Sequence, residues 1–390
     1  MTQLDSELEM LRNETRNFVE NEVIPEANER DTKGERMSDE LIDQLGDMGY
    51  FGLMIPEEYG GLGMGPLAYS LVVEELCRGW MSVGTLIARG QYIPGATDEQ
   101  KEEYLPKMAT GDKFKAVSIS ESGAGSDVAG LSTTAEKDGD EYVIDGQKMW
   151  CTGAKLSDFI CVYARTGDQS RGHKGVSGFL VDKSRGEFDV DGLSGQKLDT
   201  IGFKGWNTWE LNFDNVRVPE NKLIGEEEGK GFYQIMNFFE PARIHVASRG
   251  IGLARGALED SLAYAQEREQ FGEEIGNFQA IRFKLATMAT KIEAARQLTH
   301  DVARKKQTED GRLDLEARCD HEAAMAKYYA SEMAEEVTSE GIQIHGGNGY
   351  TTDYPLERYW RDARLLKIVD GTSEIQQRII ADRLFEKGVK

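Results

Sequence analysis

The apolar pattern of this chain changes its period twice, and that double change limits the folds it can adopt. Residues 1 to about 112 carry apolar side chains at helical spacing, beginning with Leu4, Leu8, Leu11, Phe18 and Val19. Short β-rich runs separated by turn residues occupy the next stretch, to about residue 225, and helical spacing then returns. The pattern predicts helices, then a β region, then helices again.

The first helical region is expected to contain two strong helices. Pro25 lies just past the first helix, where a proline can end it. The second helix is predicted over Tyr69–Ala88, and Gly60–Gly63 forms a loop between the two.

Five short runs rich in β-branched and aromatic residues define the middle region. The turn signals Asp138-Gly139 and Asp145-Gly146 lie between them. An antiparallel sheet or barrel is the expected arrangement of these runs, which span 114–120, 141–144, 159–164, 176–181 and 209–213.

The last region predicts a helical bundle. Apolar residues recur every three or four positions between Ile281 and Leu298, and Glu309–Gly311 breaks that helix. A further helix is expected over 315–344, and Gly371–Ser373 opens the final one. The expected fold class is α+β and mainly α, with a helical region over 1–112, a β region over 113–225 and a second helical region over 226–390.

The chain is strongly acidic, with 69 Asp and Glu against 46 Lys and Arg among 390 residues and a net charge of −23. Nucleic acid and anionic lipid both require a basic surface, so neither is expected as a partner. The acidity is spread along the whole sequence. It fits a well-solvated enzyme or an adaptation to high salt, and both explanations stay open.

The cysteines and the N-terminus indicate a cytoplasmic protein. Cys77, Cys151, Cys161 and Cys319 form no Cys-x-x-Cys pair and have no histidine at metal-ligand spacing, so reduced core thiols and no metal are expected. The polar, acidic N-terminus lacks the features of a signal or transit peptide. No run of about 18 apolar residues occurs, so no membrane span is predicted.

Two segments of the middle region have the chemistry to contact a ligand. Residues 118–127, SISESGAGSD, follow a predicted strand and combine small residues with hydroxyls and amides, although an ordinary polar turn has the same composition. Trp150 and Thr152 could stack on a planar ring and donate a hydrogen bond to it. The alternative for Trp150 is a core position in the sheet.

Three further segments lie in the last region. Asp370 stands before a glycine and a helix N-terminus, where it could cap the helix or act as a general base beside exposed amides. Arg268 near a helix end suits a phosphate but could equally be solvated. The glycines of Gln343–Tyr350 allow close backbone approach, and His345 within it is expected to be structural.

Together these segments resemble the acyl-CoA dehydrogenase family. ESGAGSDVAG is similar to the family's Glu-Pro-Gly-Ala-Gly-Ser-Asp signature, with Ser122 where proline is usual. KMWCTGA is similar to its Lys-Met-Trp-Ile-Thr-Asn segment, with Cys151 in place of isoleucine. EREQFG, QIHGGNGY, RDAR and GTSEIQ follow in family order and spacing. The match covers nearly the whole chain, and six motifs in register are highly specific.

The resemblance implies an acyl-CoA dehydrogenase-like fold, with an N-terminal helical domain over 1–112, a central antiparallel β domain over 113–225 and a C-terminal four-helix bundle over 226–390. It also implies a homotetramer with FAD bound between the β domain and the bundle. It places the flavin against Val117, Ser118, Ile119, Ser120, Gly125, Ser126, Trp150, Cys151 and Thr152. A neighbouring subunit would hold the pyrophosphate and adenine part through Arg268, Gln270, Phe278, Gln279, Gln343, Ile344, Gly346 and Gly347. The cofactor site would be completed by Thr372 and Glu374. Substrate contacts are implied for Ser126, Glu240, Arg243, Asp370 and Gly371.

The implied reaction is α,β-dehydrogenation of an acyl-CoA to the 2-enoyl-CoA, with electrons passed to an electron-transfer flavoprotein. Asp370 stands where most relatives carry a glutamate base. Some relatives place the glutamate directly before Arg243 instead, but Ala242 occupies that position here. Asp370 is therefore the expected base. The small side chains of Val369 and Ala242 hint at room for a branched, cyclic or longer acyl chain.

Two other functions stay open at this point. An aspartate base also occurs in the related nitroalkane oxidases, which deprotonate a carbon acid without CoA. A non-catalytic relative with a role in assembly or binding is the third alternative, and the retained flavin motifs and carboxylate argue against it.

Overall fold

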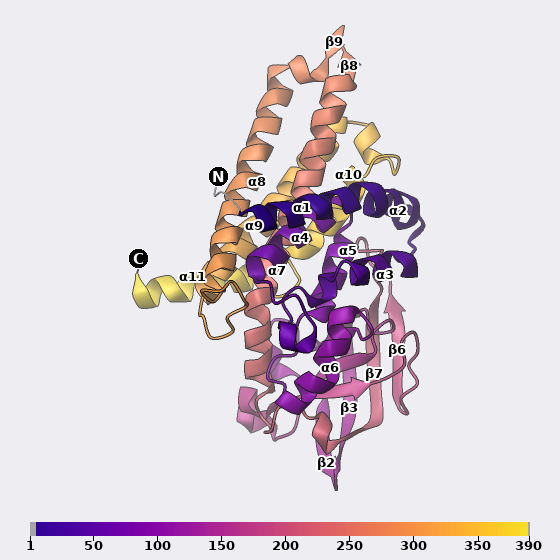
Figure 1. Ribbon diagram of the computed structural model, residues 1–390, viewed down its shortest axis with the longest axis vertical. Helices are drawn as coiled ribbons and strands as arrows, with labels where there is room; N and C mark the ends of the chain where they lie inside the picture. The colour runs from indigo at the N-terminus through magenta and orange to yellow at the C-terminus, as the bar shows by residue number, and fades with distance from the viewer. Residues whose placement is uncertain (1–4, 389–390) are drawn as a thin grey trace.

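The computed structural model describes residues 5–388, and it forms N-terminal helices, a seven-stranded sheet and long C-terminal helices in that order. Leu4, which the sequence places on the first helix, lies outside the described residues. Figure 1 shows the sheet at one end of the molecule and the hairpin of β8 (Glu269–Gln270) and β9 (Glu273–Glu274) at the other. The predicted fold class and order of elements are confirmed.

Side-chain caps mark three of the N-terminal helices, and the helix Asp39–Asp47 follows Ser38, whose side chain accepts from the amide of Leu41. Asp5 accepts a hydrogen bond from the amide of Leu8, and Thr97 forms a reciprocal capping box with Gln100. The helices of this region are α1 (Ser6–Phe18), α2 (Ile24–Arg30), α3 (Asp39–Asp47), α4 (Pro66–Gly79), α5 (Met81–Leu86) and α6 (Asp98–Thr110).

Two predicted helix boundaries in this region are wrong. Pro25 does not end the helical path, because a π-helical turn over Val19–Val23 joins α1 to α2 and places the proline in the first turn of α2. A proline is tolerated there, where its missing N–H has no intrahelical acceptor. The predicted helix over Tyr69–Ala88 is divided at Trp80, which is extended, buried, and bonded through its indole N–H to Asp31 at 3.0 Å.

The sheet has the strand order β1-β4-β2-β3-β7-β6, and β5 pairs with the other side of β4. The prediction of a purely antiparallel sheet is wrong in two pairings, because β1 and β2 both run parallel to β4. The β2–β3 hairpin lies between β1 and β4 in the chain and provides the long crossover that a parallel pair requires. The strands are β1 (Lys115–Ser118), β2 (Thr134–Asp138), β3 (Glu141–Thr152), β4 (Phe159–Arg165), β5 (Val176–Asp182), β6 (Leu193–Leu198) and β7 (Thr208–Pro219).

The strands β2 and β6 were not predicted, and one of the two predicted turns is not a turn. Both strands are rich in polar residues and lack a clear apolar alternation. Asp138-Gly139 forms the expected turn between β2 and β3, whereas Asp145-Gly146 lies within β3, where the register with β7 shifts. Gly146 has a φ of +142°, which suits a bulge in a strand rather than a chain reversal.

The C-terminal helices pack around α7, which also contacts α4 of the N-terminal region. Met288, Ile292 and Ala295 of α8 are buried in the core between α7, α8 and α9, as their spacing predicts. Gly346, with a φ of +60°, follows the last residue of α9. These helices are α7 (Gly231–Glu267), α8 (Gln279–Lys305), α9 (Asp320–His345), α10 (Leu356–Leu366) and α11 (Ser373–Lys387), of which α10 was not predicted.

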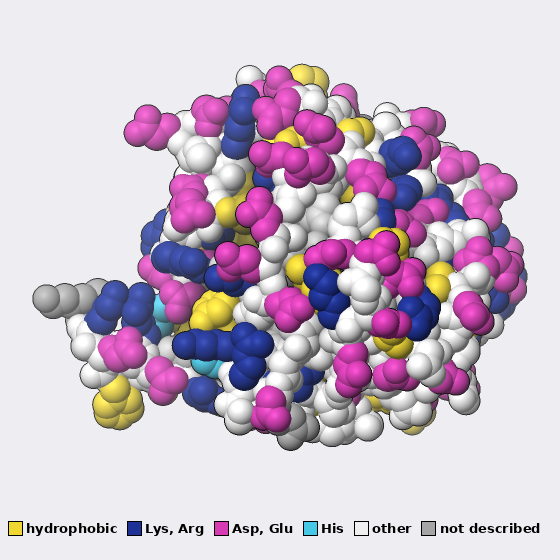
Figure 2. Space-filling view, turned by 90° about the horizontal axis from the view of Figure 1, so that it is seen from below, with side chains coloured by type: hydrophobic (Ala, Val, Ile, Leu, Met, Phe, Trp, Pro, Cys, Tyr) yellow, Lys and Arg dark blue, Asp and Glu magenta, His cyan; other side chains and the backbone are white. Residues whose placement is uncertain are grey.

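Acidic side chains cover the surface rather than forming one patch. Figure 2 shows Asp and Glu over the whole displayed face, with Lys and Arg between them. The four cysteines are buried and form no disulfide. Within residues 5–388, no helix combines the length and the apolar character needed to cross a membrane.

Candidate active site

The glycine-rich segment after β1 is shaped by a buried ion pair. Lys148 of β3 donates to Glu121 Oε1 at 2.8 Å and to the carbonyl of Ile119 at 3.0 Å. The same carboxylate accepts hydrogen bonds from Ser132 and Thr133. Burial opposes ionisation of Glu121, but the lysine charge and these hydrogen bonds outweigh it and lower its pKa to about 2. The first acid of the signature is thus a fixed scaffold for the loop.

Trp150 occupies a strained position beside this loop. The register between β3 and β7 shifts from Lys148 to Cys151, and the amide of Met149 turns aside to donate to Ser120 at 2.8 Å. Trp150 consequently has a φ of +61°, and 59% of it is exposed. Bulky residues rarely adopt this conformation, and such strain is concentrated at functional sites. The bulge therefore presents an indole ring next to the predicted flavin loop.

The loop has features that fit a bound flavin. A Cβ atom built on Gly123 or Gly125 meets no other atom within 4 Å, so folding alone does not require glycine at either position. Ser118 Oγ is buried without a hydrogen-bond partner among the described residues. Small residues and an unused hydroxyl are what a ligand that approaches the backbone closely would need. The two predicted flavin-binding segments, around Val117 and around Thr152, lie side by side, because Cys151 Sγ contacts the carbonyl of Val117 at 3.5 Å.

Asp370 lies in the turn between α10 and α11, and this turn is tightly held. Asp370 has a φ of +53°, a conformation that aspartate tolerates better than most residues. The carbonyl of Gly371 accepts hydrogen bonds from Lys327 Nζ at 2.7 Å and from Gln376 Nε2 at 2.9 Å. Thr372 caps α11 by accepting from the amide of Ile375. The Asp370 amide donates to no acceptor within residues 5–388, so it can bind an oxygen of a ligand.

Buried cations surround the Asp370 carboxylate, which is 24% exposed. Arg249 Nη2 lies 3.3 Å from Asp370 Oδ2. Burial lowers the pKa of Lys327 to about 8, while the charge of Asp370 acts in the opposite direction. Burial also lowers the pKa of Arg243, which Asp370 again opposes. Arg243 was predicted from the sequence as a substrate contact, whereas Arg249 and Lys327 were not singled out. The only sequence feature that could have indicated Arg249 and Lys327 is that each is a charged residue within a helical stretch rich in small and apolar residues.

Glu240 differs from its expected role in substrate binding. Its Oε1 accepts from the amide of Cys319 at 2.6 Å, and its Oε2 lies 3.3 Å from Lys306 Nζ. Both oxygens are therefore engaged inside the protein, and Glu240 is nearly fully buried. We assign Glu240 to fixing the start of α9 against α7.

A loop of the sheet domain connects the Trp150 and Asp370 regions. The amide of Gly153, just after β3, donates to the carbonyl of Asn207 at 2.8 Å. In the same loop, the amide of Phe203 donates to Asp362 Oδ1 at 2.5 Å. Because Asp362 belongs to α10, the helix that leads into Asp370, the loop ties both halves of the candidate site together.

The residues predicted to hold the pyrophosphate and adenine lie at the end of the molecule opposite the sheet (Figure 1), whereas Thr372 and Glu374 lie at the start of α11. Arg268, Gln270, Phe278 and Gln279 are near the β8–β9 hairpin, far from the sheet (Figure 1). The end of α9 lies beside them, because His345 stacks on Tyr264, whose carbonyl accepts from the Arg268 amide at 2.9 Å. Phe271 at the hairpin turn is 98% exposed with a φ of +56°. Within one chain, the residues near the hairpin therefore contact neither the glycine-rich loop with Trp150 nor the turn that carries Asp370.

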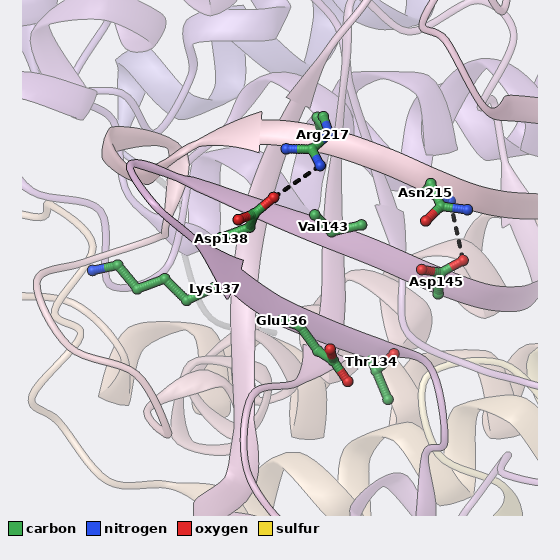
Figure 3. A pocket seen from close by; sticks show the side chains of 8 residues that line it. All are labelled: Thr134, Glu136, Lys137, Asp138, Val143, Asp145, Asn215 and Arg217. Atoms are coloured by element: carbon green, nitrogen blue, oxygen red, sulfur yellow. Dashed lines mark hydrogen bonds and ion pairs between the residues drawn. The ribbon is translucent and has the colours of Figure 1, made fainter.

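A surface hollow lies away from all of these residues. It has a volume of about 390 Å³ and lies over β2, β3 and β7 (Figure 3). Arg217 pairs there with Asp138 at 2.9 Å and with Glu141 at 3.0 Å, so its charges are already compensated. A second hollow lies between α3 and Arg185. Neither contains a predicted site residue, and within residues 5–388 no cluster of His, Cys, Asp or Glu is arranged to hold a metal.

The structure thus combines a sheet domain between helical domains, a glycine-rich loop after β1 and a carboxylate on the turn between α10 and α11. Three family models match in sequence order: acyl-CoA dehydrogenase N-terminal domain over 5–112, middle domain over 116–216 and C-terminal domain over 229–385. The chain belongs to the acyl-CoA dehydrogenase family and is an oxidoreductase.

Similar proteins support this membership over the full length. The chain is 40% identical to (2S)-methylsuccinyl-CoA dehydrogenase of Cereibacter sphaeroides, over 98% of this chain and 70% of that protein. It is 38% identical to the caffeyl-CoA reductase-Etf complex subunit CarC of Acetobacterium woodii, over 97% of this chain and 98% of that protein. The structure of butyryl-CoA dehydrogenase from Megasphaera elsdenii superposes with a TM-score of 0.90 at 35% identity, over 99% of this chain and 100% of that chain.

Proposed function

We infer that this enzyme removes the α proton and β hydrogen of an acyl-CoA thioester to form the 2-enoyl-CoA, with FAD as its cofactor. The observation that carries the proposal is Asp370, a carboxylate held on a rigid turn beside its own unused amide. A base and a carbonyl-polarising donor at one residue match the needs of α-proton removal.

FAD fits the residues around the β1 loop. Trp150 and Thr152 would contact the isoalloxazine, and Ser118, Gly125 and Ser126 would line it. Bound FAD would supply the acceptor for the β hydrogen, taken as a hydride. The chain's own contribution is to hold this ring rigidly, through the Glu121–Lys148 pair and the bulge at Trp150, opposite the α10–α11 turn.

Asp370 would act as the base and also as an oxyanion donor. The barrier to the reaction is the weak acidity of the α carbon, and developing enolate charge on the thioester oxygen is stabilised by preorganised N–H donors. The Asp370 amide is one such donor, and Lys327 holds the neighbouring Gly371 carbonyl so that the amide cannot swing away. Arg243 and Arg249 keep the surroundings of the carboxylate positive, which favours binding of an anionic enolate.

Oligomerisation and an electron acceptor complete the proposal. The residues near the β8–β9 hairpin lie too far in space from the β1 loop to contact a flavin bound there in the same subunit (Figure 1). We therefore propose that Arg268, Phe278 and Gln343–Gly347 contact the flavin of another subunit in a homotetramer. The Etf-linked relative from Acetobacterium woodii supports an electron-transfer flavoprotein as the acceptor.

The test is anaerobic bleaching of the flavin absorbance of the purified holoenzyme. Acyl-CoA thioesters of several chain types should reduce the flavin, and nitroalkanes should not. A nitroalkane that bleaches the flavin faster than every thioester would replace this function with that of a nitroalkane oxidase. Protein that cannot be reconstituted with FAD would leave only a non-catalytic role.

A further inference from the structure

We propose that Arg249 binds a second carboxylate carried by the acyl group, so that the natural substrates are CoA thioesters of short dicarboxylic acids. The subsite rests on the proposed acyl-CoA chemistry at Asp370 and specifies its acyl group. Arg249 projects from α7 between Thr85 of α5 and Asp370, and its side chain is 2% exposed.

The Arg249 guanidinium uses few of its five hydrogen-bond donors. Nη2 donates to Asp370 Oδ2 and Nη1 to Thr85 Oγ1, each at 3.3 Å. Both distances are long for a charge-assisted hydrogen bond. The Nε atom is buried with no partner within residues 5–388. Burying a charged group without acceptors is unfavourable, so folding alone gives no reason for this arrangement.

Arg255, further along the same helix, shows how this chain satisfies a structural arginine. Its Nη1 and Nη2 donate to the two oxygens of Glu75 at 2.7 and 2.8 Å, and its Nε donates to Glu259 at 2.7 Å. This is a two-pronged pair of the kind that carboxylates form with arginine. Arg249 has no such pair, although it is at least as deeply buried. A carboxylate from a ligand would give Arg249 the same arrangement.

The charges around Asp370 also favour an anionic ligand. Arg249 and Lys327, both buried, act electrostatically on each other and on Asp370. Glu332 also acts on Lys327, but it is paired with Lys367 at 2.7 Å. One carboxylate therefore faces two buried cations, which leaves a surplus of positive charge inside a chain whose net charge is −23. An anionic acyl group would neutralise that surplus.

The position of Arg249 limits the length of the acyl group. A base that removes the α proton approaches the α carbon to about 3 Å. Since Asp370 Oδ2 lies 3.3 Å from Arg249 Nη2, the arginine is within about 6 Å of that carbon. A charge-assisted bond takes about 2.8 Å of this distance, and a C–C bond is about 1.5 Å long. The second carboxyl carbon is therefore two or three bonds from the α carbon, as in succinyl, methylsuccinyl and glutaryl groups.

The subsite predicts a preference that binding alone can measure. In the Asp370→Asn holoenzyme, which lacks the base, glutaryl-CoA should bind about 10- to 100-fold more tightly than glutaramyl-CoA, in which a neutral amide replaces the carboxylate. In the wild-type holoenzyme, glutaryl-CoA or methylsuccinyl-CoA should reduce the flavin with a kcat/KM about 10²-fold above that of butyryl-CoA.

Substitutions at Arg249 separate carboxylate binding from an effect on Asp370. Arg249→Met should lower kcat/KM for glutaryl-CoA about 10²-fold more than kcat/KM for butyryl-CoA and so remove the preference for acidic substrates, and Arg249→Lys should restore part of the preference. Arg255→Lys, a buried arginine change on the same helix, should leave the preference intact. Equal loss on acidic and neutral substrates in Arg249→Met would overturn the subsite. So would faster flavin reduction by butyryl-CoA than by glutaryl-CoA in the wild-type holoenzyme, or equal binding of glutaryl-CoA and glutaramyl-CoA in Asp370→Asn. If no thioester bleaches the flavin, the proposed reaction fails, while the binding ratio in Asp370→Asn still tests the subsite.

Discussion

Replacing Asp370 by asparagine isolates the proton-abstracting role of its carboxylate. Asparagine tolerates the left-handed conformation about as well as aspartate does, so the φ of +53° adds no new strain. The Asn oxygen can still accept from Arg249 Nη2, and the Asp370 amide is retained. The α10–α11 turn, held by Lys327 through Gly371, should therefore keep its shape.

The expected effect is on rate and not on affinity. A positioned general base contributes roughly 10²–10⁴-fold, so the first-order rate of flavin reduction should fall by that factor. Because the Arg249 side chain is only 2% exposed, loss of the carboxylate charge beside it should also lower the free energy of unfolding, by up to about 3 kcal/mol. The Kd of an acyl-CoA should change little.

Stopped-flow reduction of the flavin, without oxygen and at saturating substrate, measures this rate directly. Asp138→Asn is a suitable control, because Asp138 also forms an Arg–Asp pair, with Arg217 at 2.9 Å, in the hollow of Figure 3. The control should reduce its flavin at the wild-type rate. Flavin reduction at the wild-type rate in Asp370→Asn would refute the assignment of the base.

Four further predictions follow from single features. Gly125→Val should fold normally, since no atom lies within 4 Å of its Cβ position, yet lose FAD on desalting; retention of FAD at wild-type stoichiometry would contradict the flavin loop. The pKa of Glu121 is lowered to about 2, so the stability it contributes is complete above its ordinary value of 4.5 and is lost as the pH falls toward 2; Glu121→Gln should remove this part of the acid-unfolding curve, and an unchanged curve would show that the pair is not responsible. Phe271→Asp should dissociate the oligomer in light scattering and lower FAD affinity, while an intact, saturated tetramer would exclude the hairpin from the subunit interface. Raising NaCl from about 10 to 150 mM shortens the Debye length from about 30 to 8 Å and should raise the melting temperature of a chain with net charge −23, whereas a constant melting temperature would show that self-repulsion is unimportant.

Sequence patterns predict the elements whose residues face a core at a regular period. The switch from helical to β spacing near Phe114 and the stripe from Ile281 to Leu298 both correspond to observed elements, because local periodicity and burial agree there. The break at Trp80 was not predictable, since the residue continues the apolar stripe and its partner Asp31 is distant in sequence. The parallel pairing of β1 with β4 was likewise not predictable, because it is determined by tertiary contacts and not by the local sequence of either strand.

The candidate site follows the same division. Asp370 and Trp150 could be proposed from the sequence because their residue types and neighbours in the chain are distinctive. Arg249 was not found, because only the packing of α7 against α5 and the α10–α11 turn brings it to the carboxylate. Glu240 was assigned to the substrate by its position in a motif, whereas its partners Lys306 and Cys319 come from another helix and from the residue before α9.

Two buried lysines explain how strained residues can be held on both sides of the site. Lys148 binds the Ile119 carbonyl and Glu121 beneath the loop that Trp150 faces, and Lys327 binds the Gly371 carbonyl beside Asp370. Burial lowers the pKa of each to about 8, so both are kept at a cost in desolvation. A left-handed conformation at a non-glycine residue costs of order 1–3 kcal/mol and persists only where the surroundings fix it. Each lysine fixes one backbone segment from a different domain, so the relative position of Trp150 and Asp370 is set by the packing of the domains rather than by either loop alone.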